Sequence, residues 1–153
     1  MRGDQRGAGY QARGGAVPLL VDSGPLFAYL DVQDAHHRSC TELLTEHQGP
    51  LLVPALCITE VAHLTMTRLG WEPEVRFLGD LIAGDLLVEQ LHPADLERIA
   101  ELVAIYRDLP LGTVDASVVA AAERLEITTI ATLDRRHFGA VRPAHVDSFE
   151  LLP

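Results

Sequence analysis

Four acidic residues stand where strands and helices of this sequence are expected to meet. Asp22 follows a short apolar run, Asp115 lies near the start of a helical segment, and Asp134 comes just after a β-branched run. Glu60 lies inside the helical segment that follows a second apolar run. Ligands of open parallel sheets bind beyond the carboxyl ends of the strands, so these carboxylates can converge there. Such like charges need a cation between them, and all-oxygen ligands favour Mg²⁺ or Mn²⁺, so the pattern predicts a site for a hard divalent metal ion.

Each of these acids also has an ordinary structural interpretation. Asp22 could be a turn residue, and Asp134 could be the N-cap of a following helix. Asp115 is favoured by the helix dipole wherever it stands in a first turn, and Glu60 could lie on a solvated helix face. If each interpretation held separately, four unrelated structural roles would have to place all four acids at strand ends by coincidence. We therefore prefer a shared site.

Other catalytic chemistries lack their residues. The sequence contains no G-x-S-x-G or G-x-G-x-x-G motif, and a phosphate-binding loop with its lysine is impossible because the chain has no lysine. Its seven histidines do not fall in H-x-x-x-H or H-E-x-x-H spacing. Cys40 and Cys57 fit no C-x-x-C pattern, which excludes a structural zinc site. An aromatic content of 5% offers no stacking platform for bases.

Short apolar runs alternate with helical segments along the chain and would position the four acids. We expect strands at residues 18–21, 50–53, 86–91 and 127–131, and a last edge strand at 149–152. We expect a helix after Ser23 and helices over residues 35–47, 54–69, 74–83, 93–106 and 115–125, the last one capped by Thr113. Alternating strands and helices imply an α/β fold with a parallel sheet covered on both faces.

Composition and charge limit the class of protein. With 48% hydrophobic and 22% charged residues in 153 positions, the chain is typical of one globular domain. Its net charge is −10, and all 12 basic residues are arginine. An acidic protein does not attract nucleic acid through its net field, so that role would need locally clustered arginine. Arg135 and Arg136 could grip phosphates with their planar guanidinium groups, or could simply face solvent.

The N-terminal region is expected to add no structure. Residues 1–16 are rich in glycine and poor in large apolar side chains, so we predict a disordered lead-in before a folded domain at 17–153. The apolar stretch at 16–30 resembles a signal peptide, but Asp22 and Pro25 interrupt it and no cleavage site follows. We therefore expect a cytoplasmic protein that does not enter a membrane.

Four stretches follow one another in a characteristic order: LLVDSGPLFAYLD, CITEVAHL, LPLGTVDASVVAAAERL and IATLDRRHF. Together they resemble the PIN-domain family, and more closely the VapC-type toxin ribonucleases of bacterial toxin–antitoxin pairs. The resemblance covers about residues 18–152 and implies a three-layer α/β/α sandwich around a mainly parallel sheet. It matches the family's acidic metal-binding quartet to Asp22, Glu60, Asp115 and Asp134. It also matches Thr132 to a hydroxyl residue often found two positions before the last acid, and we expect Thr132 and Ser23 to support the metal ligands.

The resemblance further implies an Mg²⁺- or Mn²⁺-dependent endoribonuclease that is usually dimeric and inhibited by a cognate antitoxin. RNA targets in the family include tRNA and ribosomal RNA. A cation held by the carboxylates would lower the pKa of water for attack on the scissile phosphorus. We expect Asp22, Asp115 and Asp134 to hold the metal, the first two directly. Asp134 and Glu60 would bind through water or orient the nucleophile.

Two other functions remain open at this point. The same acids would serve another metal-dependent phosphohydrolase or nuclease, acting on small phosphoesters or DNA structures. A non-catalytic PIN-like binding module would instead carry the acids as vestiges. A response to Mg²⁺ separates the two, because a binding module should show none.

Overall fold

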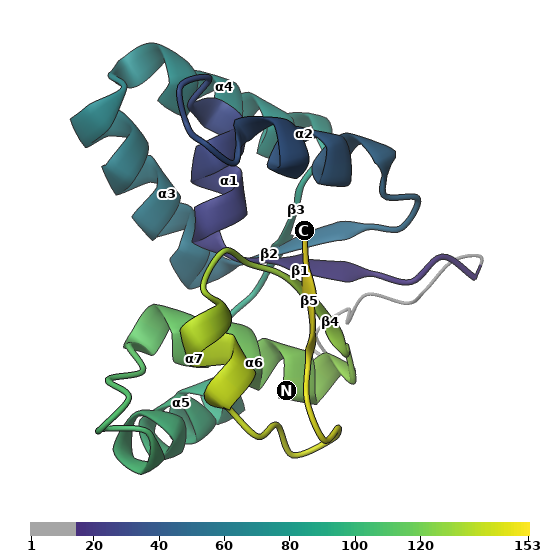
Figure 1. Ribbon diagram of the computed structural model, residues 1–153, viewed down its shortest axis with the longest axis vertical. Coiled ribbons are helices and arrows are strands. Elements are labelled where there is room, and N and C mark those ends of the chain that lie inside the picture. The colour runs from purple at the N-terminus through teal and green to yellow at the C-terminus, as the bar shows by residue number, and fades with distance from the viewer. Residues whose placement is uncertain (1–14) are drawn as a thin grey trace, which may run out of the picture.

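Within residues 15–153, which the computed structural model describes, five short strands form one parallel sheet in the order β3-β2-β1-β4-β5 (Figure 1). All neighbouring strands pair in parallel. The strands are β1 (Leu19–Val21), β2 (Leu51–Pro54), β3 (Leu87–Glu89), β4 (Thr129–Ala131) and β5 (Glu150–Leu152). The five predicted strands are therefore confirmed. Residues 1–14 of the predicted lead-in lie outside the described residues.

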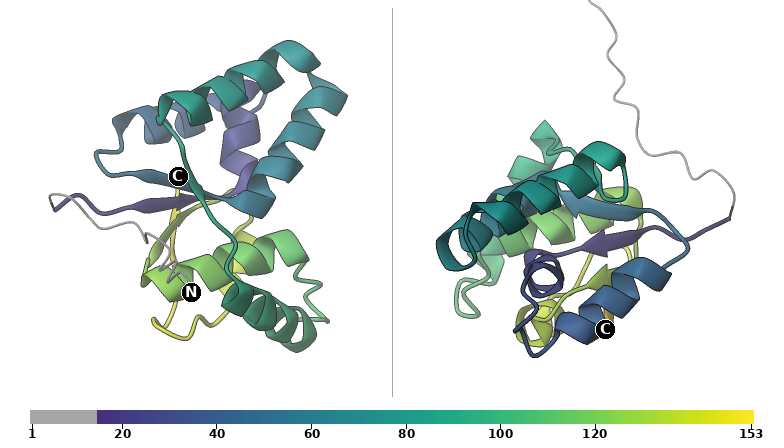
Figure 2. Two further views of the ribbon diagram at one scale, coloured as in Figure 1. Left: turned by 180° about the vertical axis from the view of Figure 1, so that it is seen from behind. Right: turned by 90° about the horizontal axis from the view of Figure 1, so that it is seen from above.

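Helices cover both faces of this sheet (Figures 1 and 2). They are α1 (Ser23–Leu30), α2 (His37–Glu46), α3 (Ala55–Arg68), α4 (Trp71–Ala83), α5 (Pro93–Ile105), α6 (Thr113–Leu125) and α7 (Arg135–Ala140). Helices α1 to α4 lie on one side of the sheet, and α5 and α6 lie on the other. The predicted three-layer α/β/α fold is confirmed. None of the described helices is both long and apolar enough to cross a lipid bilayer.

The central strand β1 is buried completely because helices cover it from both sides. Leu19, Leu20 and Val21 expose none of their surface, as expected for a continuous apolar run in a parallel sheet. Leu20 stands in register with Leu52 of β2 and with Ile130 of β4. The residue that follows β1 is therefore held in the middle of the carboxyl edge of the sheet.

Helix α6 packs through a face of small side chains. The residues of this face are all buried: Ala116, Val119, Ala120 and Ala122. Small side chains let a helix approach its neighbours closely, which fixes the position of its first turn. The predicted cap is wrong, because Gly112 is the N-cap and Thr113 is the first helical residue. The helix therefore begins before residue 115, and Asp115 lies inside its first turn.

Helix α4 starts earlier than predicted, and only part of its apolar surface is buried. It begins at Trp71 rather than at residue 74. Phe77 is its fully buried residue and Leu81 packs beside the core, whereas Val75 and Ile82 are exposed. Apolar spacing alone therefore does not tell which side of this helix faces the core. Gly84, with a φ of 82°, ends the helix where the sequence predicted.

Candidate active site

The carboxyl ends of β1 and β4 bring Asp22 and Asp134 to the same edge of the sheet. The Asp22 amide donates to the carbonyl of Ala131 at 2.9 Å, which continues the pairing of the two strands. Thr132, directly after β4, donates its hydroxyl to Oδ2 of Asp22 at 2.9 Å. The same hydroxyl oxygen accepts the backbone N–H of Asp134 at 3.0 Å. Thr132 therefore fixes both predicted acids, and it is buried, as is Asp22.

The N-terminal turns of α1 and α3 bring in Glu60. Because α3 starts at the carboxyl end of β2, its second turn lies at the same edge of the sheet as Asp22. The hydroxyl of Ser23 donates to Oε1 of Glu60 and lies 3.4 Å from Oδ1 of Asp22. Ser23 thus links the carboxylates of Asp22 and Glu60, and its expected support of the metal ligands stays a prediction.

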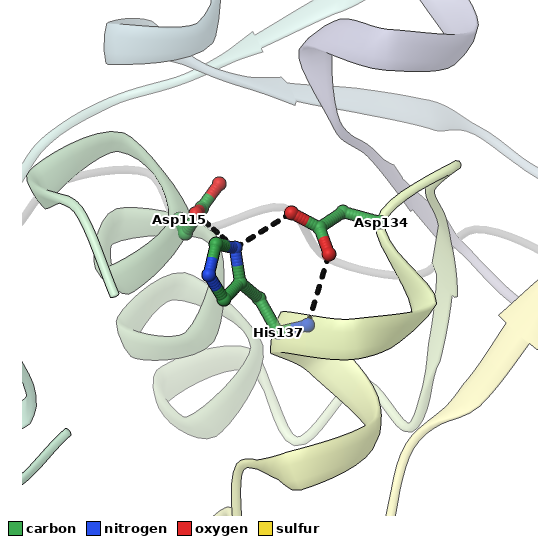
Figure 3. Close-up of side chains that lie close together, drawn as sticks. All are labelled: Asp115, Asp134 and His137. Atoms are coloured by element: carbon green, nitrogen blue, oxygen red, sulfur yellow. Dashed lines mark hydrogen bonds and ion pairs between the residues drawn. The ribbon is translucent and has the colours of Figure 1, made fainter. Parts of the chain in front are cut away.

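Asp134 both caps a helix and faces the other acids. Its Oδ1 accepts the backbone N–H of His137 at 2.9 Å, so it is the N-cap of α7. Its Oδ2 lies 2.6 Å from Nδ1 of His137, and this nitrogen is also 3.3 Å from Oδ2 of Asp115 (Figure 3). Nε2 of the same ring lies 2.9 Å from the carbonyl oxygen of Leu109. The structural and the functional interpretations of Asp134 are compatible, because Oδ1 caps the helix while Oδ2 faces His137 and the other acids.

His137 was not among the residues singled out from the sequence. The sequence does hold a clue to its position. If Asp134 is an N-cap, its side chain accepts a hydrogen bond from the backbone N–H of residue 137, in the first turn of the helix. The side chain of residue 137 then returns toward the cap residue. Proximity to Asp115 has no such local signal, since it depends on how α6 and α7 are placed in the fold.

The four predicted acids line one open cavity of about 620 Å³. Phe27 and Leu64 contribute apolar walls, and Arg135 and Arg136 stand at its rim with exposed side chains. The guanidinium of Arg135 donates to the carbonyl of Pro153. The structure therefore brings together every acid that the sequence singled out, together with both arginines: Asp22, Glu60, Asp115 and Asp134.

Comparison with known proteins identifies the family to which this arrangement belongs. Residues 19–142 match the PIN domain. The chain belongs to the PIN-domain family. It is also 33% identical over 135 residues to Ribonuclease VapC26 of Mycobacterium tuberculosis, an alignment that covers 88% of this chain and 100% of that protein. The resemblance predicted from four sequence stretches is confirmed.

Solved structures of similar fold come from three bacteria. Mycobacterium tuberculosis VapC20, a Sarcin-Ricin loop cleaving toxin, superposes with a TM-score of 0.76 at 19% identity, over 84% of this chain and 98% of that one. VapBC2 from Rickettsia felis, bound to a DNA fragment from its promoter, gives 0.64 at 12% identity, covering 88% and 97%. FitAcB from Neisseria gonorrhoeae gives 0.61 at 15% identity, covering 88% and 96%. At these identities the likeness establishes the PIN fold.

Burial and mutual repulsion disfavour the ionised state of the acids in this PIN-domain cavity. Burial raises the pKa of Asp22 from 3.8 to about 6, with further upward contributions from Asp115 and Glu60, while the hydrogen bond from Thr132 works in the opposite direction. Burial also raises the pKa of Asp115, to which the charges of Asp134 and Glu60 add and which His137 partly offsets. A positive charge that enters the cavity therefore stabilises the folded protein.

The donor atoms of the cavity fit a divalent cation. One atom each from Asp115, Asp134 and His137 lies within 4.8 Å of the others, while Asp22 and Glu60 line the same cavity outside this compact group. In the part of the chain that the structure describes, no arginine forms an ion pair with any of the four acids, and Nδ1 of His137 lies within 3.3 Å of a carboxylate oxygen of both Asp115 and Asp134. Carboxylate oxygens with one imidazole nitrogen form a donor set for a first-row or alkaline-earth divalent ion.

Proposed function

We propose that this chain is a metal-dependent endoribonuclease that acts as the toxin of a toxin–antitoxin pair, and that residues 17–153 form its catalytic domain. The observation that carries the proposal is the convergence of Asp22, Glu60, Asp115 and Asp134 on one cavity at the carboxyl edge of the sheet. Membership of the PIN-domain family supports it. So does the 33% identity to Ribonuclease VapC26 along the whole length of that protein.

The proposed cofactor is Mg²⁺ or Mn²⁺. Asp115 and Asp134 would hold it, with Asp22 as a further carboxylate at the same cavity. Once bound, a divalent cation lowers the pKa of water and stabilises negative charge on a phosphate group. The raised pKa of Asp22 and that of Asp115 support this role, since acids that repel one another gain most from a shared cation.

The other side chains of the cavity would position the reactants. Thr132 holds the carboxylate of Asp22 in one orientation, and Ser23 holds that of Glu60. Glu60 is half-buried at the cavity and would orient the attacking water. Exposed guanidinium groups of Arg135 and Arg136 would bind RNA phosphates at the rim. Since the chain as a whole carries a net charge of −10, this attraction must be local.

The proposed partners are an RNA substrate and an antitoxin protein. The fold likeness to VapBC2 and to FitAcB supports a place in such a pair. We propose tRNA or ribosomal RNA as the target, a homodimer as the active form, and the cytoplasm, where these RNAs are found, as its location. A dimer would place arginines of two chains along one groove, which would offset the acidic total.

Cleavage of total RNA by the purified chain tests the proposed activity. With Mg²⁺ or Mn²⁺, discrete fragments are expected, and mapping of their ends gives the target and the cut position. Asp115→Asn should lower the rate at least about 100-fold with an unchanged circular dichroism spectrum, because one carboxylate of the cation site is lost. Asp108→Asn, an exposed acid in the loop before α6, is the matched control and should cleave normally.

The same experiment separates the alternatives. Metal-dependent hydrolysis of small phosphoesters or DNA with intact RNA would support another phosphohydrolase or nuclease. A chain that neither cleaves RNA nor responds to a divalent cation would overturn the proposed function in favour of a binding module.

A further inference from the structure

The ring of His137 is held in one tautomer by a contact outside the acidic cluster. Nε2 lies 2.9 Å from the carbonyl oxygen of Leu109, which can only accept a hydrogen bond. Nε2 therefore carries the hydrogen, and the lone pair of the neutral ring is at Nδ1. A backbone carbonyl that fixes a ring in this way is the usual outer partner of a histidine that binds a metal ion.

The free nitrogen faces the two carboxylates rather than solvent. Figure 3 shows Nδ1 directed between Asp115, on α6, and Asp134, before α7. It is 2.6 Å from one carboxylate oxygen and 3.3 Å from the other. Neighbouring ligands of an octahedral ion with bonds of about 2.1 Å are roughly 3 Å apart, which lies between these two separations. Three electron-rich atoms at such spacing need positive charge among them, and a metal ion, unlike a proton, can contact all three.

We infer that Nδ1 of His137 is a direct ligand of the cation, together with one oxygen each of Asp115 and Asp134. The inference rests on the metal site of the proposed function and deepens it. It gives the site a nitrogen donor that an all-carboxylate quartet lacks. Imidazole strengthens binding of first-row transition ions much more than binding of Mg²⁺, so the site should prefer Mn²⁺, and Co²⁺ still more, over Mg²⁺.

The alternative is a purely structural role for His137. Its ring joins the loop before α6 to α7, and this link alone could hold Asp115 and Asp134 in place. One substitution separates the roles. His137→Gln keeps a polar group within reach of the Leu109 carbonyl and removes the group at Nδ1.

Pulsed electron paramagnetic resonance of the full chain loaded with Mn²⁺ in nitrogen-free buffer tests the ligand directly. The wild-type protein should show modulation from a coordinated ¹⁴N nucleus, which changes to the ¹⁵N pattern when the histidines are labelled with ¹⁵N. His137→Gln should lose this modulation, and His63→Gln, at an exposed histidine on α3, should keep it. If His137→Gln does not fold, the wild-type spectrum with and without the label still decides whether a histidine is bound.

Calorimetry with Mn²⁺, Co²⁺ and Mg²⁺ gives the second measurement. His137→Gln should lower the Mn²⁺ and Co²⁺ affinities at least about tenfold and the Mg²⁺ affinity by less. Absence of nitrogen modulation in the wild-type protein, or its persistence in His137→Gln, would overturn the inference. RNA cleavage is scored separately. If the chain cleaves RNA but shows no nitrogen coordination, the proposed function stands and the inference is wrong. If it shows nitrogen coordination but does not cleave RNA, the proposed function is wrong and the inference stands.

Discussion

The hydroxyl of Thr132 donates a 2.9 Å hydrogen bond to Oδ2 of Asp22, joining two residues that lie 110 positions apart in the sequence. The same oxygen accepts the backbone N–H of Asp134. One buried threonine thus holds the carboxylate that follows β1 and the backbone that follows β4. The relative position of two of the four acids depends on this group.

Replacement of Thr132 by valine should therefore destabilise the fold and disturb the site together. The change keeps the shape but removes a hydrogen bond to a buried carboxylate, which costs about 1.5–3 kcal/mol of unfolding free energy. Urea denaturation at neutral pH measures the loss. Thr132→Ser restores the hydroxyl and should recover most of it. Equal losses in both variants would mean that packing of the methyl group, not the hydrogen bond, is what matters.

Asp115→Asn should not destabilise the protein when a chelator is present. Because the pKa of Asp115 is raised, mainly by burial and also by Asp134 and Glu60, its charge is a net cost to the metal-free fold. The variant should melt at the wild-type temperature or above it. Mg²⁺ at about 100 times its Kd should add ~2.7 kcal/mol to the wild-type protein and less to the variant.

A role of Asp115 confined to the start of α6 predicts the opposite pattern. Loss of its charge would then remove a favourable dipole interaction of ~0.3–1 kcal/mol, and Mg²⁺ would stabilise neither protein. Four melting temperatures, for two proteins with and without Mg²⁺, distinguish the two roles.

The buried Asp22 should make the metal-free protein less stable as the pH rises. Burial raises its pKa from 3.8 to about 6, so the folded state binds this proton more tightly than the unfolded chain does. Its contribution is complete below pH 3.8, falls as the pH rises, and is lost above about pH 6. It amounts to at most about 3 kcal/mol. In chelator, the unfolding free energy of the wild-type protein relative to Asp22→Asn should decline from pH 4 to pH 7, and parallel curves for the two proteins would contradict this.

Arg136→Gln should weaken RNA binding without changing the chemical step. Arg136 is exposed at the rim of the cavity, where its guanidinium can reach a phosphate. KM should rise with little change in kcat, and the dependence of binding on salt should fall by about one phosphate contact. Arg142→Gln removes an exposed arginine that does not line the cavity and is the control. Equal effects of both substitutions would point to net charge instead of a local contact.

Expression of the intact chain without a partner should stop bacterial growth. Asp115→Asn should be harmless at the same protein level, because the proposed toxicity requires RNA cleavage. Co-expression of the protein from the adjacent reading frame should restore growth to cells that make the wild-type chain. Normal growth with abundant, folded wild-type chain and no partner would argue against a toxin.

Most of the fold follows from local patterns because the sheet is covered on both faces. Fully buried parallel strands have unbroken apolar sequences. For this reason the predicted bounds of β1 and β4 agree with the structure to within two residues. The acids after these strands were then placed at one edge by the geometry of parallel sheets. Together with the helix-borne Glu60 and Asp115, Asp22 and Asp134 could therefore be grouped from the sequence, although their catalytic roles remain predictions.

What the sequence pattern missed depends on tertiary placement. The ring of His137 meets Leu109, 28 residues earlier in the chain, and this contact exists only because α7 docks beside the loop before α6. The exposed Val75 and Ile82 show a related limit. An apolar helical repeat does not show which apolar side of a helix faces the core, and in α4 the side that carries Phe77 is buried.

The order of the cavity residues along the chain determines when, during synthesis, the cavity can be complete. Asp22 belongs to the first strand, while Asp134 and His137 lie close to the end of the 153 residues. A nascent chain therefore has no complete cation site until its last helix has been synthesised, and β5, which pairs with β4, follows later still. Under the proposed function, the growing chain would therefore lack cleavage activity until α7 has been made.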